Sequence, residues 1–293
     1  MSLINAEIAR QPQAWRTALS VGATAADLPR RGERVAVVGC GTSLYMAMAY
    51  AALREAGGHG ETDAFATSEF PAGRHYDRYV VICRSGTTSE VLEFLRGRTD
   101  APTVALTAVP TMPIAQYADE IVDLSFADEE SVVQTLFATT ALTTLRAHLG
   151  EDLTGLDVAA GRAVEAPLDE RWIAAEQITF LGRGWAVGVA HEAALKLREA
   201  TNAWTEAYPS MEYRHGPISI AAPGRVVWHF GAGGDELRDE VEATGATFVD
   251  HDDDPVVDLI RVQRLAAEIA ERKGLDPDRP RHLTRSVVLT AAH

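Results

Sequence analysis

The architecture of the chain first shows in Val35-Ala36-Val37-Val38-Gly39-Cys40-Gly41-Thr42-Ser43, where an apolar run ends in a turn of glycines and hydroxyl residues. Four successive apolar residues are typical of a short strand buried inside a sheet. A helical pattern follows over about residues 44–56. Short apolar strands that alternate with helices predict a parallel sheet with helices on both faces.

The same unit recurs through the first half of the chain. A second strand over residues 79–82 leads into Cys83-Arg84-Ser85-Gly86-Thr87-Thr88-Ser89, which opens a helix through Leu95. Further strands are predicted over residues 103–106 and 120–124, and a long helix over 131–149.

The layout starts again after a mixed polar stretch over residues 150–171, which we interpret as an inter-domain connection. A strand over 178–181 runs into Gly182-Arg183-Gly184. Helices are then predicted over 187–200, 235–245 and 256–272, and strands over 225–230 and 246–249. The sequence therefore predicts an α/β fold with two domains, residues 1–155 and 165–293. Each is expected to be a parallel sheet flanked by helices, a flavodoxin-like or Rossmann-like three-layer sandwich. The second copy is shorter, so its sheet is expected to lack a strand.

Composition narrows the class of protein. The formal charge of −15 argues against nucleic-acid binding, which depends on attraction to phosphates. No apolar run is long enough to suggest a membrane span, and the N-terminus has no signal-peptide pattern. Only two cysteines are present, so a disulfide framework is excluded and a reducing, cytoplasmic location is expected.

Two loops of the first half are candidates for binding an anion, since ligands of such sheets bind beyond the carboxyl ends of the strands. The 39–43 loop lacks the third glycine of a dinucleotide fingerprint and the Gly-Lys-Ser/Thr of a P-loop, which argues against a nucleotide. The 83–89 loop offers four hydroxyls, a glycine and an arginine at a helix start, where backbone donors and the helix dipole favour a phosphate. Thr87 and Glu90 also match a capping box, so some of these hydroxyls could simply cap the helix.

One helix of the second half carries an unusual acid–base pattern. Glu192, Lys196 and Glu199 share a helix face, and Lys196 is one of only two lysines. The other lysine, Lys273, lies before Gly274 and is interpreted as part of a helix C-terminus. A solvated Glu–Lys pair is the simple alternative for Lys196. Carboxylate, lysine and a histidine such as His215 are also the groups that moving a proton next to a carbonyl requires.

These motifs resemble the sugar isomerase (SIS) domain. Gly39-Cys40-Gly41-Thr42-Ser43 and Ser85-Gly86-Thr87-Thr88, at this separation, are similar to its phosphate-binding loops, and two such halves in tandem are similar to the isomerase half of glucosamine-6-phosphate synthase and its stand-alone isomerase and deaminase relatives. The resemblance implies that a sugar phosphate is bound by Ser85, Thr87 and Thr88 together with Cys40, Gly41, Thr42 and Ser43. Cys83 and Arg84 stand where the family often has serine and glutamine, and Arg84 is expected to add an ion pair to the phosphate.

The resemblance extends to the second half. Glu192-Ala193-Ala194-Leu195-Lys196-Leu197-Arg198-Glu199, followed by Arg214-His215-Gly216-Pro217, is similar to the family's catalytic segment. It implies that Glu199 is the proton-transfer base and that Lys196 contacts the substrate. It also implies that His215 assists ring opening from a neighbouring subunit, and hence a homodimer with shared active sites.

The tail departs from the family pattern. Residues 278–287 resemble the family's C-terminal signature, but Arg285 stands where the synthase has an imine-forming lysine, and arginine cannot form an imine. Arg285 is expected instead to bind substrate oxygens. The chain also shows no glutaminase domain, so glutamine-dependent synthesis is not expected. No metal ligand set is recognised and no cofactor is expected.

Together these features predict an enzyme that interconverts aldose and ketose forms of a hexose or amino-hexose 6-phosphate, or a deaminase, by proton transfer between C1 and C2. Two alternatives stay open: a deglycase acting on 6-phosphorylated fructosyl-amines, and a non-catalytic sugar-phosphate sensor. The expected partners are the sugar phosphate and a second copy of the chain, with no nucleic acid and no membrane.

Overall fold

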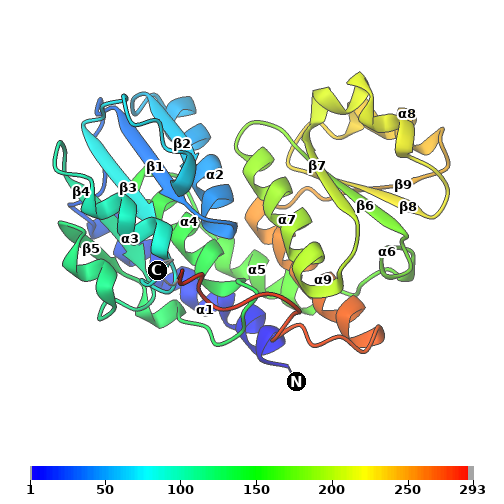
Figure 1. Ribbon diagram of the computed structural model, residues 1–293. Coiled ribbons are helices and arrows are strands. Elements are labelled where there is room, and N and C mark those ends of the chain that lie inside the picture. The colour runs from blue at the N-terminus through cyan, green and yellow to red at the C-terminus, as the bar shows by residue number, and fades with distance from the viewer. Residues whose placement is uncertain (1, 290–293) are drawn as a thin grey trace. The chain divides into compact units, whose positions relative to one another are not determined.

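A computed structural model describes residues 2–289. By its internal contacts the chain divides into two compact units, each built around one sheet (Figure 1). One unit holds residues 13–130, 136–153 and the C-terminal segment from residue 284; the other holds the N-terminal residues through Pro12, residues 131–135 and residues 154–283. Relative to a single division near residues 155–165, both ends of the chain are exchanged between the two units.

The first sheet has five parallel strands in the order β2-β1-β3-β4-β5. Its strands are β1 Val35–Gly39, β2 Thr62–Ala66, β3 Arg78–Ile82, β4 Thr103–Thr107 and β5 Glu120–Asp123. All were predicted except β2. That strand lies at the sheet edge, and its half-buried sequence Thr-Asp-Ala-Phe-Ala has no apolar run to reveal it.

Helices cover this sheet on both faces (Figure 1). They include α2 Thr42–Ala56, α3 Ser89–Arg96 and α4 Leu136–His148, with short 3₁₀ turns η1 Thr67–Glu69, η2 Pro113–Gln116 and η3 Ser125–Ala127. Helix α1 Leu3–Thr24 is divided between the two units after Pro12. Val91 and Leu95 of α3 pack in one core cluster with Val38 and Val81 of the strands. Helix α4 begins later than predicted, because the Glu129 carboxylate accepts the backbone N–H of Leu136 at 2.9 Å and so caps it there.

The second sheet has four parallel strands in the order β7-β6-β8-β9, one fewer than the first, as expected. The strands are β6 Gln177–Gly182, β7 Thr205–Pro209, β8 Arg225–Phe230 and β9 Thr247–Asp250, and the helices are α5 Leu156–Glu165, α6 Glu170–Ile173, α7 Ala186–Thr201, α8 Asp235–Glu242 and α9 Pro255–Arg272. The 3₁₀ turns η4 Ser210–His215 and η5 Pro217–Ile220 follow β7. The polar stretch interpreted as an inter-domain connection contains helices α5 and α6, and the division between the two units falls inside it, after Leu153.

Apolar side chains alternate between the two faces of the second sheet. Phe180 and Trp228 pack with α7 and α9 on one face, whereas Leu181 and Val227 pack with Leu237 of α8 on the other. The unit is therefore a sheet between two helical layers (Figure 1).

Two glycines occupy equivalent positions at the end of β1 and of β6 and in the turns that follow these strands. A Cβ at Gly39 would lie 2.6 Å from the Ser43 backbone, and one at Gly182 would lie 2.2 Å from the Ala186 carbonyl oxygen. The second glycine of each pair, Gly41 or Gly184, has a positive φ of 56° or 58°. The predicted α/β fold with two parallel sheets flanked by helices is confirmed.

Candidate functional site

The two hydroxyl-rich loops of the first unit meet at the point where the strand order of its sheet reverses. Strands β1 and β3 are neighbours, with Gly39 paired to Ile82 in register. The loops that follow them, residues 40–41 and 83–88, therefore leave the same sheet edge side by side, toward α2 and α3. In open parallel sheets with the order 2-1-3-4-5, ligands bind at this switch point.

The hydroxyls of the 83–88 loop form one cluster. The Ser85 oxygen lies 3.1 Å from the Thr87 hydroxyl and 3.5 Å from the Thr88 hydroxyl, and it accepts the Thr87 backbone N–H at 3.2 Å. Thr88 is the N-cap residue of α3, yet its side chain makes no capping hydrogen bond. The capping alternative for these hydroxyls is therefore not what the structure shows.

Residues 284–289 of the C-terminal segment lie on this loop. The Ser286 hydroxyl accepts from Thr87 at 2.9 Å and from Ser85 at 3.1 Å, and it lies 3.4 Å from Thr88. Beyond it, the backbone carbonyl of Val287 accepts the N–H of Ser89 at 3.0 Å, which is the first residue of α3. Ser286 was not among the predicted site residues, because its partners lie about two hundred positions away in the sequence.

Arg84 is buried rather than exposed at the loop surface. Its guanidinium, 2% exposed, lies 3.3 Å from the carboxylate of Glu129, which is 0% exposed, and it donates to the Arg285 carbonyl at 2.9 Å. Arg285 in turn pairs with Asp128 and donates to the Glu129 carbonyl. These contacts join three segments that are distant in sequence.

The 40–43 loop places its groups in a more closed environment. Thr42 and Ser43 are buried at the start of α2, and Cys40 is half-buried. Burial raises the pKa of the Cys40 thiol, partly opposed by a hydrogen bond from Thr67. The thiol therefore stays protonated at neutral pH and is a poor nucleophile. Cys83, at the end of β3, lies 3.7 Å from the Thr88 hydroxyl.

In the second unit, α7 brings the predicted acid–base residues into direct contact. The Lys196 ammonium, 1% exposed, lies 2.5 Å from Glu199 and 3.5 Å from Glu192. Glu192 is fully buried, whereas Glu199 keeps 20% of its side chain exposed. The helix ends just beyond, at Asn202, which takes the left-handed conformation typical of a C-cap. The simple alternative of a solvated Glu–Lys pair was wrong.

His215 ends the 3₁₀ turn η4 and is exposed. The turn is anchored by two buried residues: Tyr213 packs in the core, and the Ser210 hydroxyl lies 2.9 Å from Nε2 of the buried His229. Gly216, with φ at 130°, follows directly. An anchored turn thus presents the imidazole on the surface of the unit.

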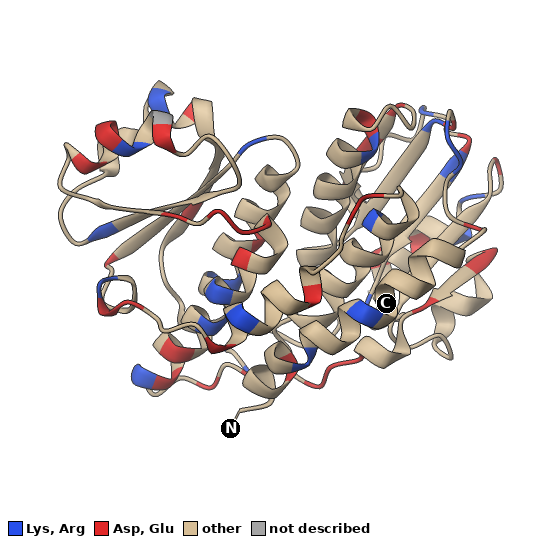
Figure 2. Cartoon of the chain, turned by 180° about the vertical axis from the view of Figure 1, so that it is seen from behind, with Lys and Arg blue, Asp and Glu red and all other residues tan. Residues whose placement is uncertain are grey.

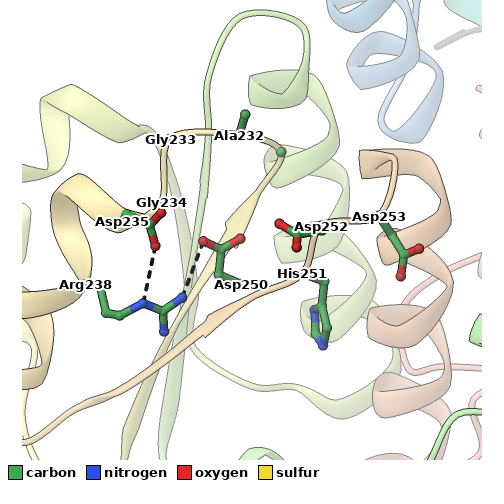
Figure 3. Close-up of a pocket in the computed structure, with 10 residues that line it drawn as sticks. Ala232, Gly233, Gly234, Asp235, Arg238, Asp250, His251, Asp252 and Asp253 are labelled. Carbon is green, nitrogen blue, oxygen red and sulfur yellow. Dashed lines mark ion pairs between the residues drawn. The ribbon is translucent and has the colours of Figure 1, made fainter.

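A cavity of about 480 Å³ lies at the carboxyl ends of β8 and β9 (Figure 3). Strand β8 occupies the place in its sheet that β3 has in the first, so residues 231–234 correspond to the 83–88 loop. This loop reads Gly-Ala-Gly-Gly and carries no hydroxyl. The cavity is lined by four aspartates and by Arg238, which is 3.7 Å from Asp235 and 3.6 Å from Asp250. Such an acidic lining disfavours a phosphate.

Further features of residues 2–289 concern their charged positions, shown in Figure 2, and the absence of membrane-spanning helices and metal-binding clusters among them. Acidic positions occur in helices and loops of both units (Figure 2), in line with the formal charge of −15. No helix in this range is long and apolar enough to cross a membrane. Among the same residues, no group of three or more His, Cys, Asp or Glu side chains is arranged to hold a metal ion.

Known proteins similar to this chain act on sugar phosphates. The isomerizing glutamine–fructose-6-phosphate aminotransferase of Sulfurisphaera tokodaii is 27% identical over 300 residues, which cover 89% of this chain and 51% of that protein. The corresponding enzyme of Pseudomonas aeruginosa is 26% identical over 92% of this chain and 54% of its own length. The chain matches no protein-family model.

Solved structures give the same result. Glucosamine-6-phosphate deaminase from Thermotoga maritima superposes with a TM-score of 0.82 at 25% identity, covering 98% of this chain and 100% of that one. The fold is also that of tagatose-6-phosphate ketose/aldose isomerase from Escherichia coli, with a TM-score of 0.77 at 17% identity over 99% of this chain and 98% of the other.

The fold and the comparisons together define a class. The homologues of the chain are the isomerase (SIS) domain of glucosamine-6-phosphate synthase, and its structural neighbours are phosphosugar isomerases and a glucosamine-6-phosphate deaminase. The predicted resemblance to these proteins is thereby confirmed, and the tandem arrangement of two such domains stays a prediction. The chain spans about half the length of the curated relatives that it matches.

Proposed function

We propose that the chain is an enzyme that moves a proton between C1 and C2 of a hexose or amino-hexose 6-phosphate, interconverting its aldose and ketose forms. The phosphate is held by the hydroxyls of Ser85, Thr87 and Thr88, with residues 40–43 beside them. The dipole of α3 adds a favourable potential for the anion. No glutamine-dependent step and no cofactor are part of this proposal.

Glu199 is the proposed base. It takes the proton from C2 of the open aldose, and the electron pair left behind forms an enediolate with negative charge on the carbonyl oxygen. Lys196 stabilises that charge. A proton then passes from the C2 hydroxyl to the C1 oxygen, and the same carboxyl returns its proton to C1, which gives the ketose. The observation that carries this proposal is the contact between the buried Lys196 ammonium and the partly exposed Glu199 carboxylate. A lysine this deeply buried, held by two carboxylates, is a preorganised cation.

Deamination is the second candidate, favoured by the superposition on a glucosamine-6-phosphate deaminase. In that reaction the same proton transfer turns the C2 amine into an imine, and water hydrolyses the imine to a ketone with release of ammonia. The two reactions therefore share the proposed residues and differ in their products.

The test is turnover of glucosamine 6-phosphate, galactosamine 6-phosphate, fructose 6-phosphate and a fructosyl-amine 6-phosphate in D₂O. We expect deuterium to enter C1 or C2 of one of them, with release of ammonia if the chain is a deaminase. Release of free amino acid would indicate the deglycase, and binding of a sugar phosphate without turnover or exchange would contradict the proposal and support a sensor.

The variant that tests the base is Glu199→Gln, which should lower kcat by at least ~10²-fold while phosphate binding is retained. The matched control is Glu268→Gln in α9, a carboxylate in a helical ion pair 2.7 Å from Arg272, which should keep wild-type turnover. Wild-type rates in both variants would refute the assignment of Glu199.

We also propose a cytoplasmic homodimer in which His215 opens the sugar ring in the partner's active site. Mixing inactive Glu199→Gln and His215→Ala chains then creates heterodimers with one intact site, and activity should recover to about a quarter of wild type by statistics of random pairing. If His215 serves its own chain, every site in the mixture lacks one residue and the activity stays at the level of the separate variants.

A further inference from the structure

Arg84 and Glu129 form a buried ion pair in the first unit, and further hydrogen bonds fix both residues. Burying two charges is costly unless further hydrogen bonds satisfy their remaining donors and acceptors. Here the Glu129 carboxylate also accepts the first N–H of α4, from Leu136. On the opposite side, the backbone carbonyl of Arg84 accepts from the Thr107 hydroxyl at 3.2 Å. The pair is thus fixed within the fold.

The same pair holds the C-terminal segment. The Arg84 guanidinium donates to the backbone carbonyl of Arg285, and the Arg285 guanidinium donates back to the carbonyl of Glu129 at 3.1 Å. Asp128 adds an ion pair to Arg285. Arg285 is therefore held both through its backbone carbonyl and through its side chain.

Ser286, the residue after Arg285, belongs to the hydroxyl cluster. Ser286 Oγ lies within 3.4 Å of the hydroxyls of Ser85, Thr87 and Thr88. Two further hydrogen bonds continue the attachment: Ser89 donates its backbone N–H to the Val287 carbonyl, and its hydroxyl accepts the N–H of Leu289 at 2.8 Å.

We propose that Arg84 and Glu129 are positioning residues that hold residues 284–289 on the phosphate loop, and that Ser286 is the fourth hydroxyl of the phosphate site. This inference rests on the proposed function. The four hydroxyls satisfy one another in the structure, and because a hydroxyl hydrogen rotates freely they can turn to donate to a phosphate. The proposal gives Arg84 a positioning role, in place of the predicted ion pair with the phosphate itself.

The positioning role is tested without any ligand. In Arg84→Met, amide hydrogen exchange of residues 285–289 and of Ser89 should accelerate at least ~10-fold, because one anchor of the segment is lost. Arg84→Lys, which keeps a cation for Glu129, should restore part of the protection. The control is Arg146→Met, which removes a similarly buried arginine from an ion pair in the same unit, with the partly exposed Glu151. Unchanged exchange in Arg84→Met, or equal acceleration in the control, would overturn the positioning role.

The binding role is tested with inorganic phosphate and then with the turned-over sugar phosphate. Ser286→Ala should weaken phosphate binding about 10-fold, the effect of one hydrogen bond to a charged group. Arg84→Met should weaken it similarly, and both should raise KM while kcat changes less than twofold. Unchanged binding, or tighter binding that reveals the segment as a competitor of phosphate, would overturn the role of Ser286.

The two proposals fail in different ways. If neither the wild-type protein nor Ser85→Ala binds phosphate, the proposed phosphate site is refuted. The role of Ser286 is then refuted as well, whatever the hydrogen-exchange data show. If Ser85→Ala abolishes binding while Ser286→Ala leaves it intact, the phosphate site stands and only the inference about the C-terminal segment is refuted.

Discussion

Lys196 lies in an environment that is unusual for a lysine. Lysine side chains are seldom fully buried, yet this one is 1% exposed and lies between Glu192 and Glu199. The spacing of four and three residues along α7 places all three on one face, so the contact follows from the sequence pattern. What the pattern could not show is the depth of burial, which depends on the packing around the helix.

Replacing Lys196 by methionine should destabilise the fold, because it leaves the buried Glu192 carboxylate without its neighbouring cation. We expect a loss of about 3–5 kcal/mol in the free energy of unfolding, measured by urea denaturation at neutral pH. Adding Glu192→Leu to this variant should recover part of the loss. A loss below about 1 kcal/mol would mean that solvent screens the pair.

His229 should make stability dependent on pH. Burial lowers the pKa of this histidine below the usual value of 6.5. As the pH falls below 6.5, the unfolded chain takes up the proton first, so stability is retained above that pH and is lost as the pH falls through the lowered folded value. The unfolding free energy should therefore drop between pH 7.5 and 5.5, and less so in His229→Asn. An equal drop in both proteins would assign the effect to other groups.

Arg84 shows why part of the site could not be predicted. The hydroxyl loop was recognisable from adjacent residues, and its position after β3 agrees with the prediction. The partners of Arg84 are Glu129 and the Arg285 carbonyl, 45 and 201 positions away, and nothing in the sequence around Arg84 predicts either contact. Contacts of this kind depend on the completed fold.

At the scale of elements, strand ends and the helices that follow them carry the clearest sequence signals. Central strands such as β1 and β3 are continuous apolar runs and were predicted within one residue. The edge strands β2 and β7 were missed, because half-exposed strands mix polar and apolar residues. The final helix α9 ends at Arg272 before Gly274, with φ at 66°, as the glycine cap predicted.

The glycine at the end of each leading strand gives a prediction at this scale. Gly39→Ala and Gly182→Ala should each lower stability by about 1–3 kcal/mol, because the new Cβ would overlap the backbone of the following helix. Gly161→Ala in α5, where a Cβ meets nothing within 4 Å, should instead raise stability by up to about 1 kcal/mol. Thermal unfolding of the three variants measures the difference. Equal effects at all three positions would show that backbone entropy, and not close approach, governs them.

At the scale of the whole molecule, neither unit is a single stretch of chain. Residues through Pro12 and residues 131–135 belong to the unit formed mainly by the second half of the chain. The segment from residue 284 belongs to the unit formed mainly by the first half. The number of sheets and their strand types followed from the repeated pattern of the sequence. The exchange of the two ends did not, because no local pattern indicates which sheet a terminal segment joins.

Separate expression of residues 1–155 and 165–293 should therefore give unstable fragments. The second fragment lacks Ile4 and Ile8, each 1% exposed in the intact chain, and the hydrogen bond between Gln11 and Gln263. We expect broad, non-cooperative thermal transitions for each fragment in circular dichroism, and a sharper transition when the two are expressed together. A cooperative transition of either fragment alone, at the temperature of the full chain, would contradict this.

The position of Ser286 also sets an order of events during synthesis. It follows Ser85 by 201 positions, so at common translation rates the ribosome needs roughly 10–40 s to reach it after Ser85 has been made. The first sheet has time to form in that interval, with its hydroxyl loop still lacking the C-terminal segment. A nascent chain stalled before residue 284 would thus carry a folded sheet without the segment that covers its loop.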